Sequence, residues 1–201
     1  MSGAEQVLIL ASASPRRSEI LSTLGIVFET RPSDADESSI EQHDDVEFAR
    51  EAALLKLTTA LDASGAAGAW VLAADTTVCV GGRRLGKPAN EGDALEMLAL
   101  LQGREHVVRT AIAFGRVGQG VLGTEVVETR VWFREAAIDE LGRYVASGES
   151  LDKAGAYAVQ GLASGFVTRI EGSYTNVVCL PAAEVVELLR THGALREWPG
   201  A

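Results

Sequence analysis

The stretch VLILASASPRRSEILSTLG, residues 7–25, decides the fold class. It begins with an apolar run over residues 7–11, passes through small polar residues to Pro15, and then places apolar residues at helical spacing before Gly25. This order predicts a strand, a loop and a helix. Such a unit is typical of α/β proteins, in which strand ends are common places for ligand sites.

The same signals continue outward from this unit. Hairpins interrupt the alternation of strands and helices, so we expect one mixed twisted sheet flanked by helices, in a single domain spanning residues 1–201. The predicted helices cover 45–61, 92–101, 136–146 and 181–192; the predicted strands cover 69–80, 83–85, 107–117 and 121–133, and alternation at 166–170 continues through 177–180.

Composition excludes several classes of protein. The chain has 18 basic and 28 acidic residues, a net charge of −10, which argues against a nucleic-acid partner and requires any anionic ligand to find a local basic pocket. Its start lacks a signal-peptide pattern, and no run approaches the roughly 18 apolar residues of a membrane helix. We therefore expect a cytoplasmic protein without a membrane partner, in which Cys79 and Cys179 are buried thiols.

Two glycine patterns resemble nucleotide-binding loops without fitting them. Residues 81–87 match G-x-x-x-x-G-K, but Pro88 follows where that loop needs a hydroxyl, so Gly81-Gly82 is better explained as a hairpin turn. Residues 118–123 match G-x-G-x-x-G but precede an alternating strand instead of a helix, which predicts a plain turn. The histidines are too scattered for a metal site, and we expect surface or capping roles for His43, His106 and His192.

The loop after the first strand has the features of an anion site. Ser14 and Pro15 predict a helix N-cap and first helical position, with Arg16 and Arg17 on the first turn. Free N–H groups and the positive end of the helix dipole attract phosphate at such a position. The alternative is an ordinary capped helix whose arginines lie in solvent.

Acidic residues supply the second part of a candidate site. Asp75 ends a strongly apolar run, where its carboxylate can serve as a base or a metal ligand; the alternative is a residue that caps the following turn. Asp34, Asp36 and Glu37 are further oxygen ligands for a hard divalent ion, or else a solvated acidic loop. The chain has 15 arginines, and its three lysines, Lys56, Lys87 and Lys153, fall in the segments that carry these candidates.

Six segments, taken in order, resemble a known family. They are ASASPRRSEIL, PSDADE, AADTTV, LGKP, LDKAGAYAVQG and FVTRIEGSYTNVVCLP, and together they resemble the Maf family of nucleoside triphosphate pyrophosphatases over residues 7 to about 190. The resemblance implies a mixed α/β fold related to the inosine triphosphate pyrophosphatases, two lobes with a central nucleotide cleft, a divalent cation such as Mg or Mn, and a homodimer.

The resemblance also implies roles for individual residues. The family's proton acceptor falls on Asp75, and its metal positions fall on Glu37 and Asp75. The phosphate-handling positions fall on Ser12, Arg17, Lys56 and Lys87, and the selectivity positions on Arg16, Thr76 and Gln160. One departure is Cys179, which stands where the family often has glycine.

The segment around Gln160 is similar to the branch that hydrolyses dTTP and UTP, whereas a sister branch acting on 7-methyl-GTP has Glu at this place. The implied reaction releases pyrophosphate and leaves a nucleoside monophosphate, from canonical or modified pyrimidine nucleotides. The alternative is a nucleotide-binding regulator of cell division with little turnover, because the family has been linked with septum formation.

Overall fold

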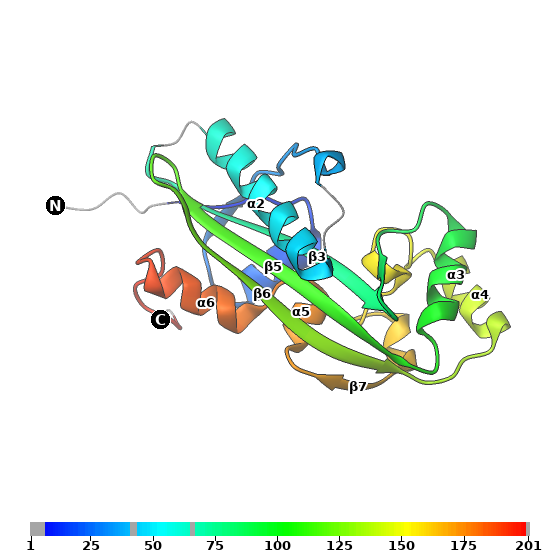
Figure 1. Ribbon diagram of the computed structural model, residues 1–201. Coiled ribbons are helices and arrows are strands. Elements are labelled where there is room, and N and C mark those ends of the chain that lie inside the picture. The colour runs from blue at the N-terminus through cyan, green and yellow to red at the C-terminus, as the bar shows by residue number, and fades with distance from the viewer. Residues whose placement is uncertain (1–6, 41–43, 65–66, 200–201) are drawn as a thin grey trace. The chain divides into compact units, whose positions relative to one another are not determined.

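The computed structural model describes residues 7–40, 44–64 and 67–199. Within these residues, seven strands form a sheet in the order β2-β1-β3-β5-β6-β7, with β4 paired to β3 (Figure 1). The strands are β1 (Leu8–Leu10), β2 (Phe28–Thr30), β3 (Trp70–Val80), β4 (Arg83–Leu85), β5 (Glu105–Arg116), β6 (Gly120–Phe133) and β7 (Val167–Glu171). The helices are α1 (Pro15–Thr23), α2 (Asp45–Ala63), α3 (Glu91–Leu101), α4 (Ile138–Ala146), α5 (Tyr174–Val178) and α6 (Ala182–Thr191).

Pairing in the sheet is mixed, as predicted. Strand β1 runs parallel to both β2 and β3, while β3 with β4 and β6 with β7 are antiparallel. The β3–β4 turn uses Gly81 and Gly82 with φ of 56° and 75°, the left-handed conformation that a tight two-residue hairpin requires. These glycines therefore form a hairpin turn, which confirms the rejection of a phosphate-binding loop.

The described residues divide into two compact units. Unit 1 contains residues up to 75, 110–126 and those from 179, and unit 2 contains 76–109 and 127–178. Strands β3, β5 and β6 each contribute residues to both units. The single domain expected from the sequence stays a prediction.

Side-chain alternation along the strands of unit 1 explains why helices cover both faces of the sheet. The odd-numbered residues Ile9, Val71 and Ala113 pack with the buried alanines of α2 in one core cluster. The even-numbered Phe114 points to the opposite face, where its ring meets His192 at the end of α6 with centroids 5.6 Å apart. Both faces are thus buried, as a continuous apolar strand such as residues 70–74 requires.

Small residues bring α2 close to the sheet. Its buried positions are Ala49, Ala52, Ala53, Leu57 and Ala60, which recur at helical spacing. Lys56 stands three residues after Ala53 and four before Ala60, so it lies on the same buried stripe. Asp44 begins the helix by accepting hydrogen bonds from the amides of residues 46 and 47, both at 3.0 Å.

Unit 2 is organised around aromatic rings. His106 lies within 4.9 Å of Phe133 and 5.3 Å of Tyr157, between ring centroids, and both contacts are edge-to-face. The expected surface role for His106 is wrong, because this residue is 1% exposed. The expected capping role for His192 is confirmed at the end of α6, and His43 lies outside the described residues.

Residues 174–178 form α5 instead of continuing the predicted extended segment. Gly172 follows β7 with a φ of 121°, and a Cβ there would lie 2.8 Å from the Thr129 hydroxyl. The Ser173 hydroxyl then accepts a hydrogen bond from the amide of Asn176 at 3.3 Å, which starts a helix. The apolar run at 177–180 carries no signal for this local capping.

In the part of the chain that the structure describes, every helix is too short or too polar to span a bilayer. Cys79 and Cys179 are buried thiols outside any disulfide, as predicted.

Candidate active site

The parallel strands of unit 1 bring three candidate segments to one edge. Leu10 of β1 pairs with Leu72 of β3 and with Thr30 of β2. The residues that follow these pairs therefore lie beyond the carboxyl ends of the paired parallel segments, where ligands usually bind in parallel sheets. Ser12 follows β1, Glu37 follows β2, and Asp75 lies three residues beyond the last β1–β3 pair.

Asp75 does not end its strand, since β3 continues to Val80 and then turns into β4. This position excludes the alternative in which Asp75 caps a turn. Its neighbours on the amino-terminal side, residues 70–74, are all buried, whereas Asp75 is the first residue of β3 that is only partly buried. The carboxylate thus emerges where the apolar core ends.

Two carboxylates bind one ammonium group. The Lys56 Nζ donates to Asp75 Oδ1 at 2.6 Å and lies 2.9 Å from Glu37 Oε1. The side chains of Lys56 and Asp75 are 16% and 13% exposed, whereas Glu37 is 43% exposed. Lys56 reaches this position from the buried stripe of α2, so the packing of the helix sets the place of its charge.

Asp75 and Glu37 are the residues of this cluster that could hold a divalent cation. A hard cation prefers carboxylate oxygens, and here the Asp75 and Glu37 oxygens already converge on one positive charge, the Lys56 ammonium. A group of three or more ligating side chains does not occur among the described residues. Asp36 has a different role: it accepts a hydrogen bond from the amide of Ser38, and hydrogen bonding to Ser38 lowers the pKa of Asp36.

Arg17 is buried within unit 1. Its Nη1 donates to Ser12 Oγ at 2.9 Å and its Nε donates to the Cys179 carbonyl at 3.1 Å. Ser14 is the N-cap residue and Pro15 the first residue of α1, as predicted, but the Ser14 side chain makes no capping bond. Instead the Ser14 amide donates to Ser12 Oγ at 3.2 Å. The arginine therefore does not lie in solvent.

Cys179 has a strained backbone. This residue has a φ of 137°, in the region that favours glycine, and it is 6% exposed. Its carbonyl is the one that accepts from Arg17. The sequence does contain a signal, because the resembled family often has glycine at this position.

Of the remaining candidate residues, Arg16 is partly buried on α1 in unit 1, and the others lie in unit 2. Thr76 is partly buried on β3, while Lys87 and Gln160 are exposed. The Gly155 amide donates to the Gly86 carbonyl at 3.0 Å, which joins the segment that carries Lys87 to the segment that leads to Gln160. A Cβ on Gly155 would meet Val78 at 2.9 Å, so this close approach requires glycine.

Two residues of unit 2 that sequence reasoning missed support the segment around Gln160. Glu149 accepts hydrogen bonds from the amides of residues 162 and 163, and Tyr144 donates its hydroxyl hydrogen to Glu149. Burial, with Glu149 beside it, raises the pKa of Tyr144. Glu149 stands in no recognisable motif, so the sequence offers no signal for it.

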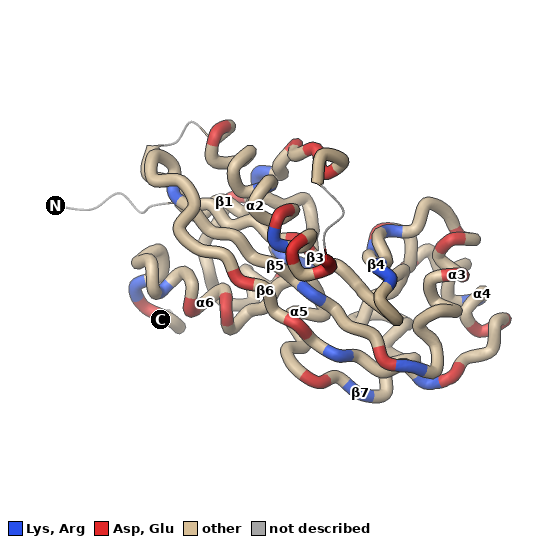
Figure 2. The backbone as a smooth tube through the Cα atoms, in the orientation of Figure 1, with Lys and Arg blue, Asp and Glu red and all other residues tan. Residues whose placement is uncertain are grey.

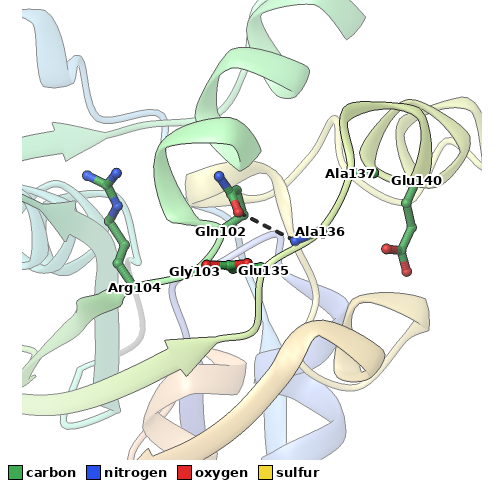
Figure 3. A pocket seen from close by; sticks show the side chains of 7 residues that line it. All are labelled: Gln102, Gly103, Arg104, Glu135, Ala136, Ala137 and Glu140. Carbon is green, nitrogen blue, oxygen red and sulfur yellow. Dashed lines mark hydrogen bonds between the residues drawn. The ribbon is translucent and has the colours of Figure 1, made fainter.

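A separate polar hollow of about 510 Å³ also lies in unit 2. Figure 3 shows Arg104 and Glu140 at opposite ends of it, with Gln102 accepting a hydrogen bond from the Ala136 amide. The lining residues are Gln102, Gly103, Arg104, Glu135, Ala136, Ala137 and Glu140. This set includes none of the residues predicted for the site.

Basic residues are dispersed among acidic ones along the backbone (Figure 2). Within this pattern the clusters at Lys56 and Arg17 are places in unit 1 where predicted site residues contact one another.

The family model for Maf-like proteins matches residues 7–192 of the chain. The chain belongs to the Maf family.

Sequence similarity to Maf relatives extends over nearly the whole chain. A dTTP/UTP pyrophosphatase of Syntrophus aciditrophicus (strain SB) is 47% identical over 94% of this chain and 91% of its own length. A dTTP/UTP pyrophosphatase of Geobacter metallireducens is 46% identical over 94% of this chain and 97% of its own. A solved nucleoside-triphosphatase / dITP/XTP pyrophosphatase from Mycobacterium abscessus aligns with 15% identity over 96% of this chain and 98% of its own, with a TM-score of 0.44.

Proposed function

We propose that this Maf protein is a nucleoside triphosphate pyrophosphatase that hydrolyses dTTP and UTP to the monophosphate and pyrophosphate. The observation that carries the proposal is the convergence of Asp75, Lys56 and Glu37 at the carboxyl edge of parallel strands. Relatives that are 46–47% identical to the chain and carry the name dTTP/UTP pyrophosphatase support the substrate class.

Asp75 is the proposed proton acceptor. Its carboxylate orients a water molecule whose oxygen attacks the α-phosphorus, and it takes the proton as that oxygen bonds to phosphorus. The bond between the α-phosphorus and the oxygen that bridges to the β-phosphorus then breaks, and pyrophosphate leaves with that oxygen. A base at this place needs a partly open carboxylate, which the 13% exposure of Asp75 provides.

Cationic side chains are proposed to hold the triphosphate. Lys56 has three N–H donors, so its ammonium can contact a phosphate oxygen while it remains near Asp75. Arg17 is fixed by Ser12 and the Cys179 carbonyl, which lowers the entropy lost on binding. Lys87 is exposed and is the proposed third cation. A chain of net charge −10 needs such local positive groups to bind a substrate with about four negative charges.

Asp75 and Glu37 are the proposed ligands of a divalent cation, Mg or Mn. When bound, such an ion polarises phosphate oxygens and offsets the charge that develops on them. The chain's own contribution is to hold two carboxylates within reach of one positive charge, the Lys56 ammonium that both of them contact.

Gln160, with Arg16 and Thr76, is proposed to select the base. Uracil and thymine present an N3–H donor beside a carbonyl acceptor, and a single Gln amide can pair with both. Guanine instead presents two adjacent donors, which suit a carboxylate. A mismatched site leaves polar groups unpaired, at about 1–3 kcal/mol for each group.

Product analysis tests the reaction. Purified protein with UTP and Mg²⁺ should release pyrophosphate and UMP, whereas orthophosphate and UDP would reject the cleavage at the α-phosphorus. A protein that binds UTP without turnover would favour the regulator of cell division instead. A panel of canonical and modified triphosphates then identifies the preferred pyrimidine substrate.

The Gln160→Glu variant tests base selection. We expect it to lose preference for UTP over GTP by about tenfold or more, because a carboxylate cannot donate to a uracil carbonyl. An unchanged preference would contradict the assignment of Gln160. The homodimer and the cytoplasmic location remain proposals, and sedimentation of the purified protein tests the first.

A further inference from the structure

Gln160 lies on an exposed turn between two anchored stretches of backbone. The Gly161 amide donates to the Ala158 carbonyl at 3.1 Å, and the Ser164 amide donates to the Gly161 carbonyl at 3.0 Å. Tyr157 is buried before this turn and Ala163 after it, while Gln160 itself is exposed. The direction in which the Gln160 side chain leaves the turn therefore depends on what holds the backbone on each side.

One carboxylate holds the backbone after Gln160. Glu149 Oε2 accepts from the Leu162 amide at 2.9 Å, and Oε1 accepts from the Ala163 amide at 3.4 Å. Hydrogen bonds of a charged acceptor to backbone amides are stronger than those between neutral groups. Glu149 thus fixes two consecutive peptide groups directly after the turn.

A phenol extends the same contact to the backbone before Gln160. The Tyr144 hydroxyl donates to Glu149 Oε1 at 3.0 Å and accepts from the Ala158 amide at 3.3 Å. The pair formed by Glu149 and Tyr144 therefore binds residue 158 on one side of Gln160 and residues 162 and 163 on the other. Tyr144 is itself 5% exposed and packs edge-to-face on Phe166, so the pair rests on rigid surroundings.

The close fit of Glu149 explains the glycine that follows Gln160. A Cβ on Gly161 would lie 2.1 Å from Glu149 Oε2 and 2.5 Å from Oε1. The φ of Gly161 is −107°, so its backbone conformation does not by itself require glycine. The requirement comes from the carboxylate, which occupies the space of a side chain.

We propose that Glu149 is a positioning residue for base selection: with Tyr144, it fixes the backbone on both sides of Gln160 and so presents the Gln160 amide in one orientation. The ligand that this orientation favours is a base with a donor and an acceptor side by side. The inference rests on the proposed function of Gln160 and adds to it the groups that make one amide selective. On a turn that moved, the Gln160 amide could reach either base with its oxygen or with its nitrogen.

Kinetics of Glu149→Gln and Tyr144→Phe test the proposal. The amide nitrogen of the introduced glutamine cannot accept a hydrogen bond, so at least one contact to residues 144, 162 or 163 is lost. We expect KM for UTP to rise about tenfold, kcat to change less than about threefold, and the UTP-to-GTP ratio of kcat/KM to fall about tenfold. Tyr144→Phe should act in the same direction, and the double variant should add little, because the two groups act as a unit.

Glu128→Gln is the matched control. Glu128 is a carboxylate of the same unit whose Oε2 lies 2.7 Å from Arg109 Nη2, on β6 and away from the turn that carries Gln160 in the chain. Its removal should leave the UTP-to-GTP ratio unchanged. Hydrogen exchange supplies a second measurement: the amides of residues 158, 162 and 163 should lose protection in Glu149→Gln and keep it in the control.

The outcomes separate this inference from the function on which it rests. If the wild-type protein releases no pyrophosphate from UTP, the proposed function fails. If the wild-type protein is active but both variants keep its UTP-to-GTP ratio, the positioning role is wrong even if stability falls. An equal loss of kcat for both nucleotides, or unaltered exchange at residues 158, 162 and 163, also overturns it. If the Glu149→Gln protein does not fold, the UTP-to-GTP ratio of kcat/KM for Tyr144→Phe decides whether the positioning role is right.

Discussion

The two units support their candidate residues in different ways. In unit 1, Asp75 is held by another charged side chain, the Lys56 ammonium, at 2.6 Å. In unit 2, Glu149 is held by two backbone amides and a phenol. Both groups are carboxylates, yet the first bonds a flexible side chain and the second bonds the main chain.

This difference indicates different chemical uses. A carboxylate paired with a flexible ammonium can exchange that partner for water, a cation or a phosphate-bound ion without disturbing the fold. A carboxylate that satisfies backbone amides is part of the local structure, because an unpaired buried amide costs about 1–3 kcal/mol. We therefore expect changes at Asp75 to alter turnover more than stability, and changes at Glu149 to alter stability or selectivity.

The largest effect is expected for Asp75→Asn. Loss of the proton acceptor should lower kcat for UTP hydrolysis by about 10³-fold, within the range of general base catalysis. The free energy of unfolding should change by less than about 1 kcal/mol, because the Asn oxygen still accepts from Lys56 and the Lys56 ammonium keeps Glu37 as a charged partner. Steady-state kinetics and urea unfolding measure the two quantities.

Asp62→Asn is the control for Asp75→Asn, since Asp62 is an exposed carboxylate of α2 in the same unit. The Asp62→Asn protein should hydrolyse UTP with the kcat of the wild type. Activity of Asp75→Asn above one tenth of the wild type would reject Asp75 as the base. A loss of several kcal/mol in stability would break the comparison between the units.

The second-largest effect is expected for the pH dependence of the free energy of unfolding, through His106 in unit 2. Burial lowers the pKa of His106 to about 4 from the ordinary 6.5, and its Nε2 lies 2.8 Å from the Tyr157 hydroxyl. Between these two values the unfolded chain binds a proton that the native state does not bind. Stability is therefore full above about pH 6.5 and falls as the pH drops, approaching a loss of about 3 kcal/mol near pH 4.

Replacement of His106 by Gln tests this assignment. Gln can keep a hydrogen bond to Tyr157 but does not titrate, so the variant should be less stable than the wild type at about pH 7.5 and lose less on acidification to about pH 4. Urea unfolding at a series of pH values measures both slopes. Parallel curves for the two proteins would show that His106 does not cause the acid sensitivity.

The sequence predicts the structure correctly where its signal is local. Three features follow from spacing over a few residues, and the structure confirms them: the strand, loop and helix of residues 7–25, the Gly81-Gly82 hairpin, and the apolar stripe of α2. The extended segment predicted at 177–180 is wrong because the capping of α5 by Ser173 competes with the apolar pattern. The prediction for His106 is wrong because its burial depends on rings distant in sequence.

The contacts of the candidate site could be predicted only in part, for the same reason. Asp75 has a local signal, a carboxylate at the end of an apolar run, whereas its contact with Lys56 joins residues 19 positions apart. The role of Lys56 comes from resemblance to a family and not from spacing. Glu149 has neither signal, since its bonds to residues 162 and 163 depend on how the chain turns back in three dimensions.

A smaller effect is expected for Glu37→Gln in unit 1. Glu37 is 43% exposed and lies 2.9 Å from Lys56, so it is the outer ligand of the proposed cation site. Its loss should raise the Mg²⁺ concentration for half-maximal activity about tenfold, which corresponds to about 1.4 kcal/mol, with kcat at saturating Mg²⁺ nearly unchanged. A titration of activity against Mg²⁺ measures this shift.

Glu29→Gln serves as the control for Glu37→Gln. Glu29 is a carboxylate of β2 that pairs with Arg31, so its removal changes the net charge equally but not the proposed site. An equal shift in both variants would mean that overall charge, and not a ligand, sets the Mg²⁺ dependence. Glu37 would then lose its proposed role.

The smallest effect is expected for the free energy of unfolding when Cys179 of unit 1 is replaced. A non-glycine residue with a φ of 137° stores about 1–3 kcal/mol of strain, and glycine at that position costs about 0.5–1 kcal/mol through the unfolded state. Cys179→Gly should therefore raise the free energy of unfolding by about 1 kcal/mol. The carbonyl that accepts from Arg17 belongs to the backbone and is retained, so kcat/KM should stay within about twofold of the wild type. Cys179→Ala, which keeps the Cβ, should gain nothing, and a Gly variant less stable than the Ala variant would show that the backbone at this position holds too little strain for glycine to relieve.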